Sequence, residues 1–178
     1  VQMIADVLLS QAALMRLQAL QFTPMLALGE RTNPLMGQLL LRQAALADQL
    51  QSARDIVLES PASVRQQQQA GMLLCALEMR DHLLASALDL EGLRTQPEQA
   101  QALSRQRGVL VALAAQLEQL ADALLLGQMP AAFQCLRAEL DLPPLAPGAG
   151  FTPERLAQAL AHRIGHIHAE VARLMALA

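Results

Sequence analysis

The chain has 178 residues and a formal net charge of -3 at pH 7, and 53% of its residues are hydrophobic. A chain of this length fits one domain with a sizeable core, so we expect residues 1–178 to form a single helical domain. The hydrophobic residues are mainly Leu, Ala, Val and Met, with three Phe and neither Trp nor Tyr. Because Ala and Leu favour helices and strand-forming aromatic residues are scarce, the composition predicts an all-α fold.

The charge pattern excludes one kind of partner. All 13 basic residues are arginine, and they are interspersed with 16 acidic residues. Binding to nucleic acid or to an anionic membrane surface needs a basic stripe or a polybasic cluster, and the sequence has neither. We therefore expect no nucleic-acid partner.

No run of about eighteen uninterrupted apolar residues marks a membrane span. The nearest approach, residues 123–136, is interrupted by Gly127 and Pro130. The chain begins at Val1 without a methionine and ends within a predicted helix at Ala178. These features lead us to expect a soluble domain that is cut from a longer protein.

The first predicted helix covers Gln2–Gln21 and ends before Pro24, because proline cannot continue the hydrogen-bond ladder. A connector of residues 27–33 follows. Asn33 is expected to cap the second helix, with Pro34 at the first helical position, where the missing N–H costs nothing.

Residues 35–93 are predicted to form two long amphipathic helices hinged at Ser60 and Pro61, with apolar residues that repeat at helical spacing. The first of these helices carries one stripe, made of Leu35, Leu39, Leu46, Leu50, Ala53 and Val57. The second carries two adjacent stripes, Met72, Ala76, Met79, Leu83 and Leu90 beside Leu73, Leu77, Leu84 and Leu88. Two stripes make a face wide enough to contact more than one neighbouring helix.

A fourth helix is predicted to start at Thr95, where Glu98 would complete a capping box, and to end at Gly127. Its apolar residues keep a heptad spacing, as in a helix of a bundle. They are Leu103, Leu110, Leu113, Leu117, Leu120 and Leu124. Pro130 is then predicted to open a short helix that ends near Leu140.

A connector rich in Pro and Gly, residues 143–150, precedes the last predicted helix. That helix is expected to start at Thr152, with Pro153 at its first position. The sequence thus predicts an up-and-down bundle of about five long helices plus one short helix.

Motifs for several well-known chemistries are absent from the sequence. There is no GxSxG elbow, no HExxH, no phosphate-binding glycine loop and no cysteine cluster. An enzyme is therefore the least favoured function, and we expect no cofactor.

Three side chains could share a metal, because His162, His166 and Glu170 recur every four residues on one helical face, with His168 nearby. A closed site needs a further ligand from another helix, and nothing in the sequence marks one. We therefore interpret the group as a polar face of the last helix.

His82 and the two cysteines are weaker candidates. The position of His82 resembles that of a phosphotransfer histidine on a helical bundle, but the residues after it are apolar, which disfavours that interpretation. Cys75 and Cys135 are expected to lie inside helices as buried thiols, and a disulfide between them stays open.

Paired charges stand on both helices of the central hairpin. For Arg54 and Asp55, a solvated helix face is favoured. Arg42 and Asp81 lie at nearly equal distances from the hinge along the chain, so an antiparallel hairpin places them at similar heights. We predict an ion pair between these two residues that fixes the register of the hairpin.

The same hairpin carries a family resemblance. The segments LLLRQAALADQLQSARDIVLESP and AGMLLCALEMRDHLLASALDLEGLR resemble the FUSC-like inner-membrane proteins. These are YccS/YhfK-type members of the aromatic acid exporter group, which is named after fusaric acid resistance. The matching features are LQSARD at residues 50–55 and LEMRDHLLAS at residues 77–86. The resemblance covers residues 35–94, and the remainder is similar only in its helical character.

The resemblance implies that this domain lies between two transmembrane blocks of a larger bacterial inner-membrane protein and faces the cytoplasm. Those transmembrane regions would then be its partners. Members of the family are regarded as exporters of aromatic carboxylic acids. No catalytic residue is implied for this region.

Three function classes therefore compete, of which an enzyme is the least favoured. The first is a scaffold or assembly domain that self-associates as a homo-oligomer, which the high apolar fraction and the wide helix faces favour. The second is a regulatory domain that senses an aromatic acid, in which Arg80 or Arg54 would meet the ligand carboxylate. The candidate ligand or interhelix contacts are Arg42, Arg54, Asp55, Arg80, Asp81 and His82.

Overall fold

The computed structural model describes residues 1–22, 32–59, 63–140 and 152–178. These residues fold into helices, and no strand occurs among them. The long helices are α1 (Gln2–Leu20), α3 (Thr32–Glu59), α4 (Val64–Leu93), α5 (Ala100–Leu126) and α7 (Pro153–Leu177). The short ones are the 3-10 helix η1 (Pro97–Gln99) and α6 (Arg137–Leu140). The predicted all-α bundle of five long helices with a short additional helix is therefore confirmed.

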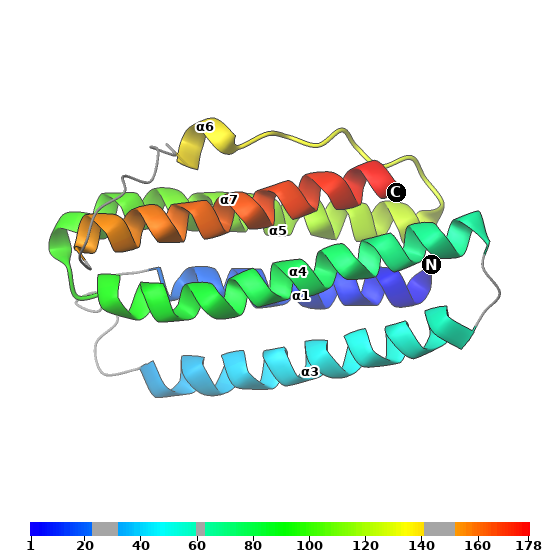
Figure 1. Cartoon of the computed structure of the whole chain (residues 1–178), viewed down its shortest axis with the longest axis horizontal. Coiled ribbons are helices and arrows are strands. Elements are labelled where there is room, and N and C mark those ends of the chain that lie inside the picture. Colours follow the sequence, from blue (N-terminus) through cyan, green and yellow to red (C-terminus); the bar gives the residue numbers. More distant parts are fainter. Residues whose placement is uncertain (23–31, 60–62, 141–151) are drawn as a thin grey trace.

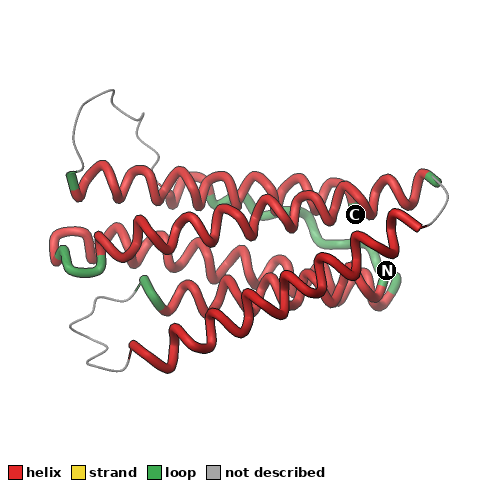
Figure 2. The backbone as a smooth tube through the Cα atoms, turned by 60° about the horizontal axis from the view of Figure 1, so that its bottom comes forward, coloured by secondary structure: helices red, strands yellow, loops and turns green. Residues whose placement is uncertain are grey.

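The long helices lie side by side in two closely packed pairs and one outer helix. α4 packs along α7, and α1 packs along α5 (Figure 1). α3 packs mainly on α1 and has fewer contacts with α4, and it forms one edge of the bundle (Figure 1), the edge that is turned forward in Figure 2. Helices α1, α3, α4 and α5 alternate in direction, whereas α5 and α7 run the same way (Figure 1). The chain after α5 must therefore return along the bundle before α7 begins.

The core is built mainly from leucine, alanine and methionine. The predicted stripes of α3 and α5 point inward: Leu39, Leu46 and Leu50 of α3 and Leu110, Leu113 and Leu117 of α5 are all buried. Burying one such side chain contributes about 1.5–3 kcal/mol. The first predicted stripe of α4 is buried as well, and Met79 is fully enclosed.

The second predicted stripe of α4 is only partly correct. Leu73 is buried and Leu77 is partly buried, but Leu84 is 37% exposed and Leu88 is 77% exposed. The reason lies in the packing, because α4 places its main contact on α7, while α3 packs mainly on α1. The face of α4 that carries Leu84 and Leu88 therefore stays largely uncovered.

Two predicted helix starts are wrong. α4 begins at Val64 rather than at Ser60 and Pro61, which lie outside the described residues. Ser63 caps this helix: its side chain accepts from the Gln66 backbone N–H, and the Gln66 side chain accepts from the Ser63 N–H, which makes a capping box.

Thr95 does not cap the fourth long helix. It lies in a turn, after which the η1 turn and then α5 begin, and no side-chain cap bond forms at Gln96 or Gln99. Pro97 explains the shift, because its ring fixes a helical φ and favours the first position of a helix. The second long helix also differs slightly, since α3 begins at Thr32 and so includes Asn33, the expected cap.

The C-terminal end of α5 and the start of α7 follow the predictions. α5 stops at Gly127, which adopts φ 64°, a left-handed conformation that glycine adopts without steric cost. At the other boundary, the Thr152 side chain accepts from the Arg155 N–H, and Pro153 takes the first position of α7.

The short helix predicted from Pro130 to Leu140 is mostly wrong. Residues 128–136 are not helical, and only Arg137–Leu140 form a helical turn. Leaving α5 at Gly127, these residues run back along the bundle to α6 (Figure 1). An extended chain covers this distance with far fewer residues than a helix does.

Among the described residues, two helices have the length and average apolarity to cross a membrane, namely α1 and the continuous η1–α5 stretch, Pro97–Leu126. Neither helix contains the uninterrupted apolar run that the sequence analysis sought, but an average over a helix tolerates isolated polar residues. In their most apolar stretches, 56% and 50% of the residues are buried inside the bundle. Core helices of a bundle meet the same criterion.

Candidate functional site

An apolar groove lies between α1, α3 and α5, with a cavity volume of about 540 Å³. Its apolar walls come from all three helices and its polar groups from α1 and α3. The walls are Ala13, Leu17 and Leu20 of α1, Leu41 of α3 and Val111 of α5. Two guanidinium groups, those of Arg16 and Arg42, line the same groove. Pockets for small ligands are mostly apolar with a few polar groups that fix orientation, and this groove has that composition.

The two arginines of the groove differ in their partners. Arg16 forms two hydrogen bonds with Glu118 of α5, from Nε to Oε1 at 2.7 Å and from Nη2 to Oε2 at 2.9 Å. Hydrogen bonding to Arg16 lowers the pKa of the Glu118 carboxyl. Arg42 is exposed, and within the described parts of the chain no ion pair joins it to an acidic side chain. The guanidinium of Arg42 is therefore the group that can donate hydrogen bonds to a ligand carboxylate in this groove.

A second polar group of side chains lies along the seam of α4 and α7. His82 of α4 stacks on His166 of α7, with ring centroids 4.9 Å apart. Further along the seam, about two turns on in α4 and less than one turn back in α7, Arg163 Nε donates to Asp89 Oδ2 at 2.9 Å. Burial, the neighbouring His166 and Arg163 lower the pKa of His82, against weaker opposing effects of nearby carboxylates. These contacts cross between the helices, so they fix the register of α4 against α7.

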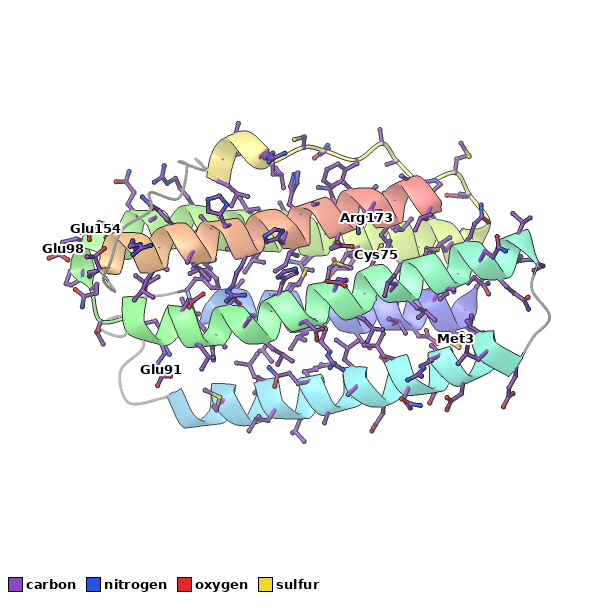
Figure 3. All side chains as sticks on the ribbon, in the orientation of Figure 1. Met3, Cys75, Glu91, Glu98, Glu154 and Arg173 are labelled. Atoms are coloured by element: carbon purple, nitrogen blue, oxygen red, sulfur yellow. The ribbon has the colours of Figure 1, made fainter. Side chains whose placement is uncertain are left out.

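At the other end of this seam, Cys75 of α4 lies near Arg173 of α7 (Figure 3). Arg173 Nη1 donates to Glu170 Oε1 at 2.8 Å, and Glu170 is buried. Burial, followed by a hydrogen bond to Glu170, raises the pKa of the Cys75 thiol to about 11. A thiol with such a pKa stays protonated at neutral pH, which suits a packing role better than a nucleophilic one.

Comparison with known families decides what this bundle is part of. A family model described as FUSC-like inner membrane protein yccS matches residues 2–145. The chain belongs to the FUSC-like family. No curated protein and no solved structure matches the chain. The FUSC-like match includes both limbs of the central hairpin, on which the sequence resemblance rests.

Family membership fixes three coarse properties of this FUSC-like chain. It is part of an inner membrane protein, it is related to membrane transport, and its family is of a transporter type rather than an enzymatic one. The match ends before α7, yet α7 packs along α4 and buries residues such as Ile164 and Ile167 in the common core. The bundle of this FUSC-like chain is therefore completed by a helix outside the matched residues.

The predicted ion pair between Arg42 and Asp81 does not form in the described structure of the FUSC-like chain. Asp81 is paired instead with Arg80, at 3.6 Å, and its side chain is 66% exposed. Arg42 lines the groove beside α1 and α5. The register argument is wrong as well, because it needed a helix beginning at Pro61, and α4 begins at Val64.

The remaining predicted contact residues lie apart from the groove. Arg54 and Asp55 are exposed on α3, where Gln51 Nε2 donates to Asp55 Oδ1 at 3.1 Å, as expected of a solvated face. Arg80 is partly buried on α4. His82 belongs to the α4–α7 seam. The sequence therefore named one groove residue, Arg42, and missed its neighbour Arg16.

The residues considered for a metal site and for a disulfide do not form either in the described structure. Among the described residues, no group of three potential ligands could hold a metal ion. His166 is stacked on His82 and Glu170 is paired with Arg173, so both side chains contact other partners. Cys75 is buried and free, and Cys135 is free and exposed in the non-helical segment after α5 rather than in a helix.

Proposed function

We propose that this region is a cytoplasmic scaffold and assembly domain of an inner-membrane exporter of aromatic carboxylic acids. Its partners are the transmembrane regions of the same protein and further copies of itself. Membership of a transporter-type inner membrane family supports the setting. One structural observation carries the assembly role: α3 and α4 leave large apolar side chains uncovered on their outer faces.

The uncovered side chains lie on the helices at one edge of the bundle. On α3 they are Met36, Leu40, Ile56 and Leu58, with Leu41 exposed at the border of the groove, and on α4 they are Val64, Leu74, Leu84 and Leu88. Leu41 and Leu88 are 73% and 77% exposed. Apolar side chains gathered on a surface are typical of contacts with another protein, and a homo-oligomer pairs such surfaces through closed symmetry.

The assembly proposal is tested by light scattering on the 178-residue chain over a range of concentrations. We expect a concentration-dependent oligomer that Leu40→Glu combined with Leu88→Glu converts to a monomer. Leu126→Glu is the matched control, because Leu126 is 68% exposed at the far end of α5. A strict monomer at high concentration, or an oligomer unaffected by the double change, would overturn the assembly role.

The cytoplasmic position is tested in the full-length protein through Cys135, which is exposed and free. With the remaining accessible cysteines replaced, a membrane-impermeant maleimide should leave Cys135 unlabelled in spheroplasts and label it after lysis. Labelling in intact spheroplasts would place the domain on the other side of the membrane.

A second function, sensing of an aromatic acid, is supported by the groove between α1, α3 and α5. Its apolar walls suit an aromatic ring, and the guanidinium of Arg42 suits the carboxylate. The groove thus favours Arg42 for this role over Arg80 or Arg54, which do not line it.

Thermal unfolding tests the sensing function. Saturating 4-hydroxybenzoate should raise the melting temperature, since a ligand at a hundred times its Kd stabilises by about 2.7 kcal/mol. Arg42→Gln should remove the shift and Arg54→Gln should keep it. Phenol, which lacks the carboxylate, should give a weaker shift. An unchanged melting temperature with 4-hydroxybenzoate rejects sensing and leaves the scaffold role intact.

A further inference from the structure

Residues 128–136, here called the strap, join α5 to α6 across the outside of the bundle (Figure 1). The strap has backbone hydrogen bonds at its ends, from Gln128 N–H to Ala123 and from Glu139 N–H to the Leu136 carbonyl. Between these ends, the hydrogen bonds that hold it come from two side chains of the bundle, Gln116 and His168. The attachment of the strap therefore depends on a few side-chain groups rather than on a backbone ladder.

The first attachment is made by a side-chain amide, which carries no charge at any pH. Gln116 of α5 donates from Nε2 to the Gln134 carbonyl at 3.1 Å and accepts at Oε1 from the Gln134 N–H at 3.0 Å. The side-chain amide thus satisfies both backbone groups of one strap residue. Gln116 itself is buried on α5, so this attachment is shielded from water.

The second attachment uses an imidazole as acceptor. The Leu136 N–H donates to His168 Nε2 at 2.9 Å, and His168 of α7 is buried. An imidazole nitrogen can accept only when it carries no proton, so this bond requires neutral His168 with its proton on Nδ1. Phe133 of the strap meets the same ring edge to face, with centroids 4.9 Å apart. The hydrogen bond from Leu136 is therefore tied to one protonation state of this ring.

The charges around His168 come from α6 and α5. Burial and the nearby Arg137 lower the pKa of His168 below its usual 6.5, and Glu139 opposes them. Arg105 of α5 lines a hollow together with Leu136 and Glu139 on the same side of the bundle. A lowered pKa means that the closed strap favours the neutral ring. The free energy by which the neutral ring stabilises the closed strap is fully present above pH 6.5. It is lost as the pH falls from there through the lower pKa of the closed state.

We propose that His168 is an acid-sensitive latch that holds the C-terminal end of the strap, Cys135 and Leu136, against α7 at neutral pH and releases it when the ring is protonated. Protonated Nε2 becomes a donor that faces the Leu136 N–H, so the bond is replaced by repulsion between two donors. Phe133 and Leu136 pack against the core in the closed strap. Release moves Leu136 away and uncovers the apolar surface beneath it, while Gln116 continues to hold Gln134.

The strap carries its own reporter position. Cys135 lies between the two attached residues Gln134 and Leu136 and is exposed, whereas Cys75 is buried with a raised thiol pKa. A nitroxide can therefore be attached selectively to Cys135 near pH 7. Electron paramagnetic resonance at pH 7.5 and pH 5.0 then measures the mobile fraction of the strap. We expect this fraction to rise at pH 5.0 and to return on neutralisation.

Three variants separate the latch from a general effect of acid. In His168→Gln, the amide oxygen can accept at either pH, so the label should stay immobile at both. In His168→Ala, the label should be mobile at both. His82→Gln replaces a histidine of the α4–α7 seam and should keep the pH response of the parent chain. Far-UV circular dichroism checks that the bundle stays helical throughout.

Hydrogen exchange gives the same readout without a label. Exchange of the strap peptide, taken relative to His168→Gln at the same pH, should accelerate by up to about tenfold for each pH unit between the usual pKa of a released histidine and the lower pKa of the closed state, and should level off below it. A label that stays immobile at pH 5.0 in the parent chain would overturn the proposal. So would a pH response that persists in His168→Gln.

Discussion

Arg16 of α1 and Glu118 of α5 form a bidentate ion pair, with both guanidinium-to-carboxylate distances at or below 2.9 Å. The pair joins the two helices that pack most closely on one side of the bundle and borders the apolar groove. Its fork geometry accepts one relative height of the two helices, so it selects the register of α1 on α5. The two side chains are 42% and 37% exposed, which limits its contribution to stability.

A double-mutant cycle on Arg16→Ala and Glu118→Ala should give a coupling free energy of about 0.2–1 kcal/mol. Solvent screening keeps the value low despite the short distances, and it should fall further in high salt. Chemical denaturation of the four proteins measures it. Arg16→Ala paired with Asp122→Ala is the control cycle and should give no coupling, so a similar coupling there would contradict a specific pair.

Met79→Ala should destabilise the bundle by about 2–5 kcal/mol, because Met79 is fully buried on α4 and its removal leaves a cavity. Leu88→Ala on the same helix should change the free energy of unfolding by less than about 0.5 kcal/mol, since that side chain is largely exposed. Urea unfolding compares the two. Equal losses at the two positions would show that the assigned faces of α4 are wrong.

Ser63→Ala should cost about 1 kcal/mol of stability, because the Ser63 side chain caps α4 and accepts from the Gln66 N–H. Thr95→Ala is the matched comparison. Thr95 lies in a turn and caps no helix, so its loss should be close to neutral. The midpoints of urea unfolding provide the test. A larger effect at Thr95 would contradict the observed caps and favour the capping box that the sequence predicts.

The two thiols should react at very different rates with a disulfide reagent at pH 8. Cys135 is exposed and should react at once, whereas Cys75 is buried and its pKa of about 11 keeps it protonated. Cys75 should become reactive only after unfolding. Absorbance kinetics on Cys135→Ser and Cys75→Ser assign each phase. Rapid reaction of Cys75 in the folded chain would contradict its burial between α4 and α7.

Removal of residues 152–178 should abolish cooperative unfolding, although it leaves the FUSC-like match intact. α7 covers the inner face of α4, and its loss would expose Cys75, Leu83 and neighbouring core residues to water. Thermal unfolding followed by circular dichroism measures the transition. A truncated chain with a sharp transition near that of the intact chain would show that the matched residues form a unit by themselves.

Local features of this protein follow directly from its sequence. The helical class follows from the abundance of Leu and Ala, and the inward stripe of α3 follows from spacing alone. The stop of α5 at Gly127 and the start of α7 at Thr152 and Pro153 were also predictable. Each depends on interactions within a few residues of the chain, such as a cap bond or a backbone angle, and these act in the same way wherever the helix lies.

The choice of neighbours was decided by the tertiary structure. α3 follows α1 and precedes α4, but it packs mainly on α1, which leaves Leu88 exposed and turns Arg42 toward the groove rather than toward Asp81. The extended strap likewise depends on Gln116 and His168, which are distant from it in sequence. Periodicity tells which face of a helix is apolar. It does not tell which helix will cover that face, because several partners offer similar apolar area and only the packing of the whole bundle selects among them.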